Sequence, residues 1–116
     1  MNKPAARFTA LSLSLLLLAG CATTGVAPAT SPGQQAAIAL LEQGKPREAA
    51  QQLEAEAALV RGSAKAQLLA DAAFAWHEAG DDARTRMLLA QVQARQLAGA
   101  SRQRHALLAA ELALAD

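Results

Sequence analysis

The chain has 116 residues, of which 53% are hydrophobic and only 3% aromatic, with 11 basic and 10 acidic side chains. This length suffices for one small domain. The charges of opposite sign are interspersed, so the sequence lacks the clustered basic face that nucleic-acid binding requires, and we expect no nucleic-acid partner. Cys21 is the only cysteine, which excludes an intramolecular disulfide.

Residues 1–20 have the composition of an export signal. Lys3 and Arg7 supply its positive end, and a run of twelve mostly apolar residues follows from Phe8 to Ala19. A run of this length fits the ~7–15 apolar residues of a signal peptide and falls short of the ~20 that span a membrane as a helix. We therefore predict a cleaved signal peptide over residues 1–20.

The residues Leu18, Ala19, Gly20 and Cys21 at the end of this run resemble the lipobox of bacterial lipoproteins. The resemblance implies cleavage before Cys21 and attachment of a diacylglyceryl group and an N-acyl chain to that residue. Two or three acyl chains hold a protein stably on a membrane, whereas one chain holds it only marginally. The alternative is a secretory signal with an incidental cysteine.

The residue after Cys21 is Ala22 rather than Asp. In the sorting rule known for enteric bacteria, Asp at this place retains a lipoprotein in the inner membrane, so we expect an anchor in the outer membrane. Residues 21–33 are then rich in Thr, Pro and Gly, and they predict a flexible linker behind the lipidated cysteine. Ala22 to Gly33 extends at most ~40 Å at ~3.3 Å per residue.

From residue 34 onward the apolar residues recur at helical spacing and no β-branched run predicts a strand, so we expect an all-α domain over residues 34–116. Gly44, Gly62, Gly80 and Gly99 divide it. The predicted helices cover residues 34–43, 46–60, 64–79, 82–97 and 101 onward. Their predicted N-caps, where a cap is evident, are Ser63, Asp81 and Ser101.

The turns at Gly44 and Gly80 predict an internal repeat. These glycines lie 36 positions apart, close to the ~34-residue tetratricopeptide period. A small residue follows each glycine five positions later, namely Ala49 and Thr85. We therefore expect antiparallel helical hairpins stacked as a short solenoid of the tetratricopeptide type.

The fifth predicted helix has an apolar stripe and no sixth helix to cover it. Its leucines include Leu107, Leu108, Leu112 and Leu114. A terminal element of a solenoid needs a polar outer face. Three interpretations follow: the reading frame continues beyond Asp116, the helix folds back on the fourth helix, or a partner covers the stripe.

Four stretches carry a family resemblance: Ala66–Ala73, Gly80–Arg84, Met87–Gln91 and Leu107–Ala113. With the lipobox and linker, they resemble the N-terminal domain of the penicillin-binding protein activator lipoproteins of the LpoA type. The resemblance covers nearly all of this chain but only the family's first portion, without its larger C-terminal domain.

The resemblance implies an outer-membrane lipoprotein that regulates peptidoglycan synthesis by contact with a class A penicillin-binding protein, without catalysis. Peptidoglycan itself is a second possible partner. One alternative is a generic tetratricopeptide lipoprotein that acts as a scaffold in envelope or pilus assembly. Another alternative is a small lipid-anchored enzyme that uses His77 or His105.

The polar residues give thin support for catalysis. His77, Glu78, Asp81 and Asp82 lie close together in sequence and could form a metal cluster. We favour a different interpretation, in which His77 ends one helix and the two aspartates begin the next. His105 has no plausible partner at helical spacing except Ser101. We therefore expect no catalytic, metal or cofactor site.

Two further features have a binding and a structural interpretation. Trp76 could anchor a ligand, but its spacing favours a place in the core. Five arginines could line a groove for an anionic ligand, although an ordinary solvated face is the favoured interpretation. They are Arg84, Arg86, Arg95, Arg102 and Arg104.

Overall fold

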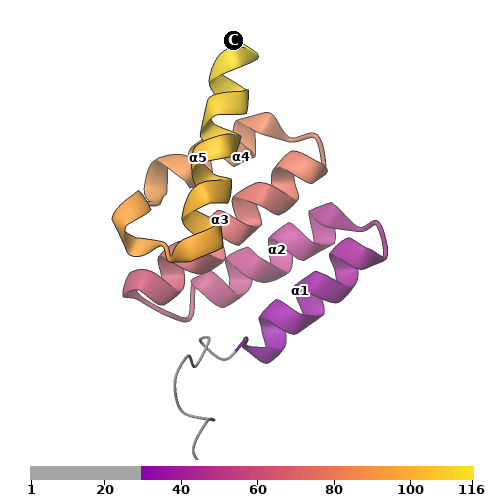
Figure 1. The fold of residues 1–116 in the computed structure, drawn as a ribbon. Coiled ribbons are helices and arrows are strands. Elements are labelled where there is room, and N and C mark those ends of the chain that lie inside the picture. The colour runs from indigo at the N-terminus through magenta and orange to yellow at the C-terminus, as the bar shows by residue number, and fades with distance from the viewer. Residues whose placement is uncertain (1–29) are drawn as a thin grey trace, which may run out of the picture.

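The computed structural model describes residues 30–116, which form five α-helices and contain no β-strand (Figure 1). The helices are α1 (Pro32–Glu42), α2 (Pro46–Ala57), α3 (Gly62–Glu78), α4 (Asp82–Gln91) and α5 (Gly99–Leu114), with a short 3₁₀ helix η1 (Ala94–Gln96) before α5. The all-α prediction is therefore confirmed for this part of the chain. The predicted signal peptide, Cys21 and most of the predicted linker lie outside the described residues.

Helix α1 begins two residues earlier than predicted. Ser31 and Gln34 form a capping box, in which the Gln34 amide N–H donates to Ser31 Oγ at 3.1 Å and the Ser31 N–H donates to Gln34 Oε1 at 2.9 Å. Pro32 occupies the first turn, where its missing N–H costs no hydrogen bond. Pro32 and Gly33 therefore belong to the helix, and the predicted linker boundary at residue 33 is wrong.

The turns after α1 and α3 are built alike. The N–H of Lys45 donates to the carbonyl of Leu40 at 2.8 Å, and the N–H of Asp81 donates to the carbonyl of Trp76 at 2.9 Å. Gly44 and Gly80 immediately precede the two donor residues and have positive φ values of 75° and 77°. This is the Schellman closure, which favours glycine because it has no Cβ. The predicted stops at both glycines are confirmed.

Other predicted helix ends are wrong. Helix α2 stops at Ala57 rather than Val60, and Gly62 opens α3 instead of only ending the helix before it. The N-cap of α3 is Arg61, which makes no side-chain capping bond, so Ser63 is not the cap. The prediction of Asp81 as a cap is confirmed, because its Oδ1 accepts from the N–H of Arg84 at 3.1 Å.

The segment between α4 and α5 also differs from the prediction. Helix α4 ends at Gln91 rather than near Leu97, and η1 follows. Arg102 holds this loop, since its guanidinium donates to the carbonyls of Ala94 and Leu97 at 3.1 and 2.8 Å. Helix α5 begins at Gly99, so Ser101 lies within its first turn and does not cap it.

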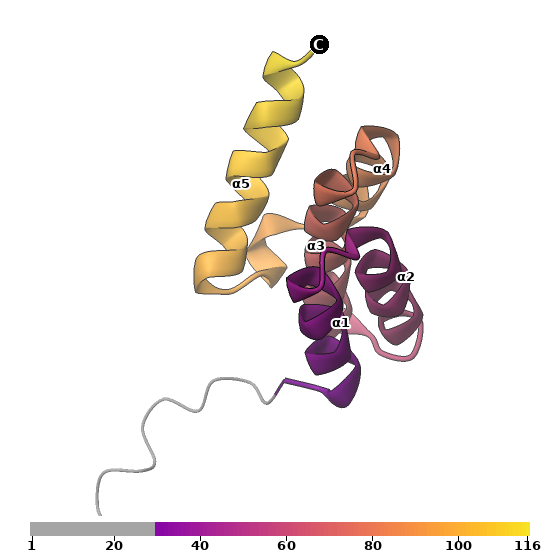
Figure 2. The same ribbon diagram turned by 90° about the vertical axis from the view of Figure 1, so that its right-hand side faces the viewer.

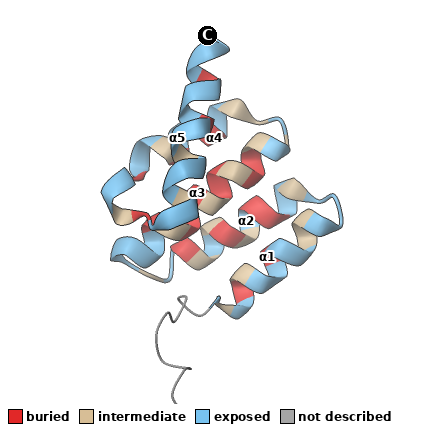
Figure 3. Ribbon diagram, in the orientation of Figure 1, coloured by how far each residue is buried: buried red, intermediate tan, exposed pale blue. Residues whose placement is uncertain are grey.

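The core lies where α2, α3 and α4 meet (Figure 3). Alanines on the facing sides of α2 and α3 are fully buried and let the backbones approach closely, as Ala49, Ala50, Ala72 and Ala73 do. Trp76 is 1% exposed and fills the space beside them, with its indole N–H donated to the Glu54 carboxylate. The prediction that Trp76 belongs to the core is confirmed.

Helix α5 packs on α3 and α4 and stands away from α1 (Figure 2). It buries Leu108 and Leu112, whereas Leu107 and Leu114 remain 66% and 88% exposed. The fold-back interpretation is therefore correct for one side of the helix, and the other side stays uncovered. None of the helices in residues 30–116 is both long and apolar enough to cross a bilayer.

Candidate functional site: the groove between α1 and α5

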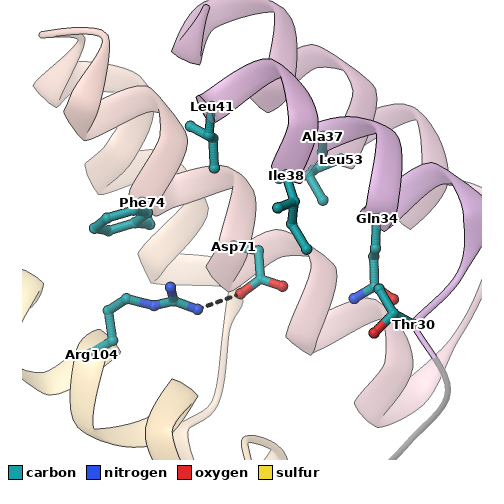
Figure 4. Close-up of a pocket in the computed structure, with 9 residues that line it drawn as sticks. All are labelled: Thr30, Gln34, Ala37, Ile38, Leu41, Leu53, Asp71, Phe74 and Arg104. Atoms are coloured by element: carbon teal, nitrogen blue, oxygen red, sulfur yellow. Dashed lines mark hydrogen bonds and ion pairs between the residues drawn. The ribbon is translucent and has the colours of Figure 1, made fainter. Parts of the chain in front are cut away.

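A cavity of about 230 Å³ lies between α1 and α5, above α3 (Figure 4). Helix α1 supplies an apolar wall through Ala37, Ile38 and Leu41, and α3 supplies Phe74. Ile38 is 50% exposed although it is a large aliphatic residue. The remaining lining residues come from the segment before α1 and from α1, α2, α3 and α5, and are Thr30, Gln34, Leu53, Asp71 and Arg104.

A larger hollow of about 770 Å³ adjoins this cavity and shares Thr30 and Gln34 with it. Its apolar lining includes Val60 and Leu68, and small residues from the start of α5 complete it. Its polar lining consists mainly of uncharged side chains, namely Ser31, Ser63, Gln67, Gln96 and Ser101, with Glu56 as the charged exception. We call the two hollows together the α1–α5 groove.

Asp71 and Arg104 form the polar centre of the α1–α5 groove. Arg104 Nη2 lies 2.8 Å from Asp71 Oδ1 (Figure 4), and Gln67 Nε2 donates to the same oxygen at 3.3 Å. Burial raises the pKa of the Asp71 carboxyl, while the charge of Arg104 and the amides of Gln67 and Gln34 act in the opposite direction. The carboxyl of Asp71 is thus the more buried member of the pair, and the guanidinium of Arg104 reaches it from the solvent side.

Two further contacts fix the walls of the groove relative to each other. The Arg104 guanidinium lies over the Phe74 ring, 4.9 Å from its centroid, in a cation–π arrangement. Gln67 also donates to the Ser101 hydroxyl, which joins α3 to the first turn of α5. The arrangement offers apolar surface with a few fixed hydrogen-bonding groups, which is the composition of a binding site.

The histidines lie outside the groove lining. His77 Nδ1 is 3.1 Å from Asp82 Oδ1, and its Nε2 is 3.5 Å from Glu111 Oε2, so the ring links α3 to α4 and α5. His105 is half-buried, and its Nε2 has no hydrogen-bond partner within the described part of the chain. Among residues 30–116, no three His, Cys, Asp or Glu side chains are placed to hold a metal ion.

The five arginines are exposed, as the solvated-face interpretation predicts. Four of them also make contacts that the sequence did not predict. Arg86 donates to the carbonyl of Leu112 at 3.0 Å and pairs with Asp116 at 2.7 Å, and Arg84 stacks 4.4 Å from the centroid of Trp76. Arg102 and Arg104 in α5 bind the loop carbonyls and Asp71, so the four arginines hold α5 against its neighbours and cover Trp76.

The groove contacts have a signal in the sequence, which is the separation of their residues along the chain. Asp71 and Arg104 are 33 positions apart, and Gln67 and Ser101 are 34 positions apart. Both separations equal the expected ~34-residue repeat within one position. Polar residues one repeat apart on the first helix of each hairpin were therefore candidates for contact across adjacent hairpins.

The predicted lipidation site, Cys21, and the lipobox residues Leu18, Ala19 and Gly20 lie outside the described residues. No family model, no curated protein and no solved structure matches this chain.

Proposed function

We propose that this chain is a lipid-anchored, non-catalytic binding domain of the outer membrane that holds a segment of a protein partner in the α1–α5 groove. Cys21 carries the acyl chains, and residues 30–116 face the periplasm. By its resemblance to the LpoA type, the partner is a class A penicillin-binding protein, and the domain contributes to the regulation of peptidoglycan synthesis.

The observation that carries this proposal is the groove itself. Its walls come from α1, α3 and α5, they expose Ile38 beside Phe74, and they hold uncharged amide and hydroxyl groups along their length. Such a surface suits a peptide or helix whose apolar side chains enter the groove while its polar groups meet the glutamines and serines.

We also propose that the fold is a short solenoid of the tetratricopeptide type. The matching turns at Gly44 and Gly80 support this, as do the groove contacts that join residues one repeat length apart. In such an arrangement α1, α3 and α5 are the equivalent first helices of successive hairpins, and their shared face is the groove.

Binding is tested by placing a charge in the groove. The Ile38→Arg variant adds a cation to the apolar wall, and we expect it to weaken binding to a class A penicillin-binding protein about tenfold or more. Met87→Arg is the matched control, because Met87 is 63% exposed on α4 and does not line the groove. Interferometry with the full-length lipoprotein in detergent measures both dissociation constants.

Equal affinities for wild type and Ile38→Arg would contradict the groove as the docking site. If the wild-type chain binds no penicillin-binding protein but captures another envelope protein through Ile38, the scaffold alternative replaces the regulatory one.

The anchor is tested separately at the cysteine. Metabolic labelling with a palmitate probe should mark the wild type and leave a Cys21→Ser variant unmarked, because the thiol is the acceptor of the diacylglyceryl group. Fractionation on a sucrose gradient should place the labelled protein with the outer membrane. An unlabelled wild-type protein in the soluble periplasmic fraction would overturn the lipoprotein assignment.

A further inference from the structure

The outward side of α5 carries five uncharged residues in one row. They lie on a different side of the helix from Leu108 and Leu112, which face the domain, and all five are exposed, although Ala100 also lines the larger hollow of the groove. They follow one another at alternating spacings of three and four positions, which is the spacing of a coiled-coil seam. We call this row the α5 seam, and its members are Ala100, Gln103, Leu107, Ala110 and Leu114.

The α5 seam is complementary to itself in size. When two copies of α5 are set antiparallel about a two-fold axis between residues 107 and 110, Leu107 of each copy faces Ala110 of the other. In the same register Leu114 faces Gln103. Each leucine therefore meets a smaller side chain, and the layers interdigitate without two leucines competing for one space.

The charges beside the seam fit the same register. Arg104 and Glu111 flank the seam on one side, where Arg104 pairs with Asp71 and Glu111 lies beside His77 of the same chain. Their side chains are still 45% and 65% exposed, so both can also meet a charge on a second copy. The antiparallel arrangement brings Arg104 of one copy beside Glu111 of the other, so that charges of opposite sign meet at the rim. Charges in these flanking positions determine the orientation of paired helices.

We propose that two copies of this chain pair through the α5 seam, antiparallel and about a two-fold axis. The exposure of Leu107 and Leu114 then has a cause, because the surface is covered by the same surface of a second copy. The pairing does not involve Ile38, although Ala100 and Arg104 belong both to the groove lining and to the seam or its rim. The test of the pairing at Gln103 and Leu114 is therefore separate from the binding test at Ile38.

A pair of single substitutions distinguishes this arrangement from others. Gln103→Cys and Leu114→Cys are placed in two full-length chains with different tags, and both chains are expressed in one cell. The seam predicts a disulfide between the two different chains. Two copies of the same variant should form about tenfold less disulfide, because identical positions lie about 16 Å apart along antiparallel helices at ~1.5 Å per residue.

Three controls test whether the disulfide depends on the α5 seam. The unsubstituted protein, whose one cysteine is Cys21, gives the background of disulfide formation. Ala109→Cys paired with Gln103→Cys should give no disulfide above that background, since Ala109 lies exposed off the seam. Adding Leu107→Glu to both chains should cut the mixed disulfide about tenfold or more while circular dichroism shows unchanged helix content.

A predominance of like-chain disulfides, the absence of any disulfide, or a disulfide to another protein would each overturn the proposal. The first result would indicate another register, the second a monomer, and the third a different occupant of the seam.

Discussion

At the scale of single residues, Asp71 combines burial with a charge partner. Burial is the larger influence and raises its pKa above the ordinary value of 3.8, while Arg104 lowers it. The folded protein therefore holds the Asp71 proton to a higher pH than the unfolded chain does. In the pH range above 3.8 where only the folded state is protonated, stability falls as pH rises.

This argument predicts the pH dependence of an Asp71→Asn variant. The wild-type free energy of unfolding should fall relative to that of the variant as pH increases from about 3.8 toward the raised pKa, and the difference should be constant at higher pH. Urea unfolding followed by circular dichroism between acid and neutral pH measures it. A difference that grows in favour of the wild type over this range would mean that Arg104 outweighs burial.

Trp76 is also buried, but its polar atom and its ring face both have partners. Its ring is almost completely buried, but its one polar atom reaches the Glu54 carboxylate, and Arg84 covers the ring face. A large aromatic side chain can enter a core that is half alanine because both its polar edge and its face have partners. The spacing of apolar residues predicts the burial of Trp76 but not these partners, which come from other helices.

At the scale of helices, the glycine turns are the features most easily predicted from sequence. Gly80 has a φ of 77°, and a Cβ at this position would meet no atom within 4 Å. Gly80→Ala should therefore destabilise the protein through backbone strain alone, by roughly 1–2 kcal/mol. For a domain of this size, each 1 kcal/mol lowers Tm by about 4–8 °C.

The matched comparison is Gly80→Asn, since asparagine tolerates the left-handed conformation better than alanine. Thermal unfolding should rank the three proteins as wild type, then Asn, then Ala. Equal Tm values for the alanine and glycine proteins would show that the turn relaxes to another conformation at little cost.

The helix starts were harder to predict than these stops. A positive φ strongly favours glycine, whereas a serine near a helix start can either cap the helix or form a hydrogen bond elsewhere in the fold. Ser31 caps α1, but Ser63 and Ser101 do not cap α3 and α5. The hydroxyl of Ser101 accepts a hydrogen bond from Gln67, more than thirty positions away. This tertiary contact, and the pairing of Asp71 with Arg104, depend on how the hairpins stack and cannot be read from local propensity.

At the scale of the whole domain, burial is distributed unevenly along the chain. Helix α3 buries eight residues and contacts α2, α4 and α5, whereas α1, α4 and α5 each bury only two. In a solenoid each helix pair depends on its neighbours, so terminal elements lack support on one side. Helices α1 and α5 are the outermost of the described helices, whereas α3, which lies between them in the groove, buries the most residues.

This distribution predicts a gradient of local stability. Native-state hydrogen exchange should give the highest opening free energies for amides of α2 and α3 and the lowest for α1 and α5, because little apolar surface is exposed when an outer helix opens. The measurement is best made on Leu107→Glu, in which the proposed pairing of α5 with a second copy cannot protect that helix. Uniform opening energies across all five helices would mean that the domain opens only as one unit. In that case a partner could not gain affinity by ordering α1 and α5 around itself.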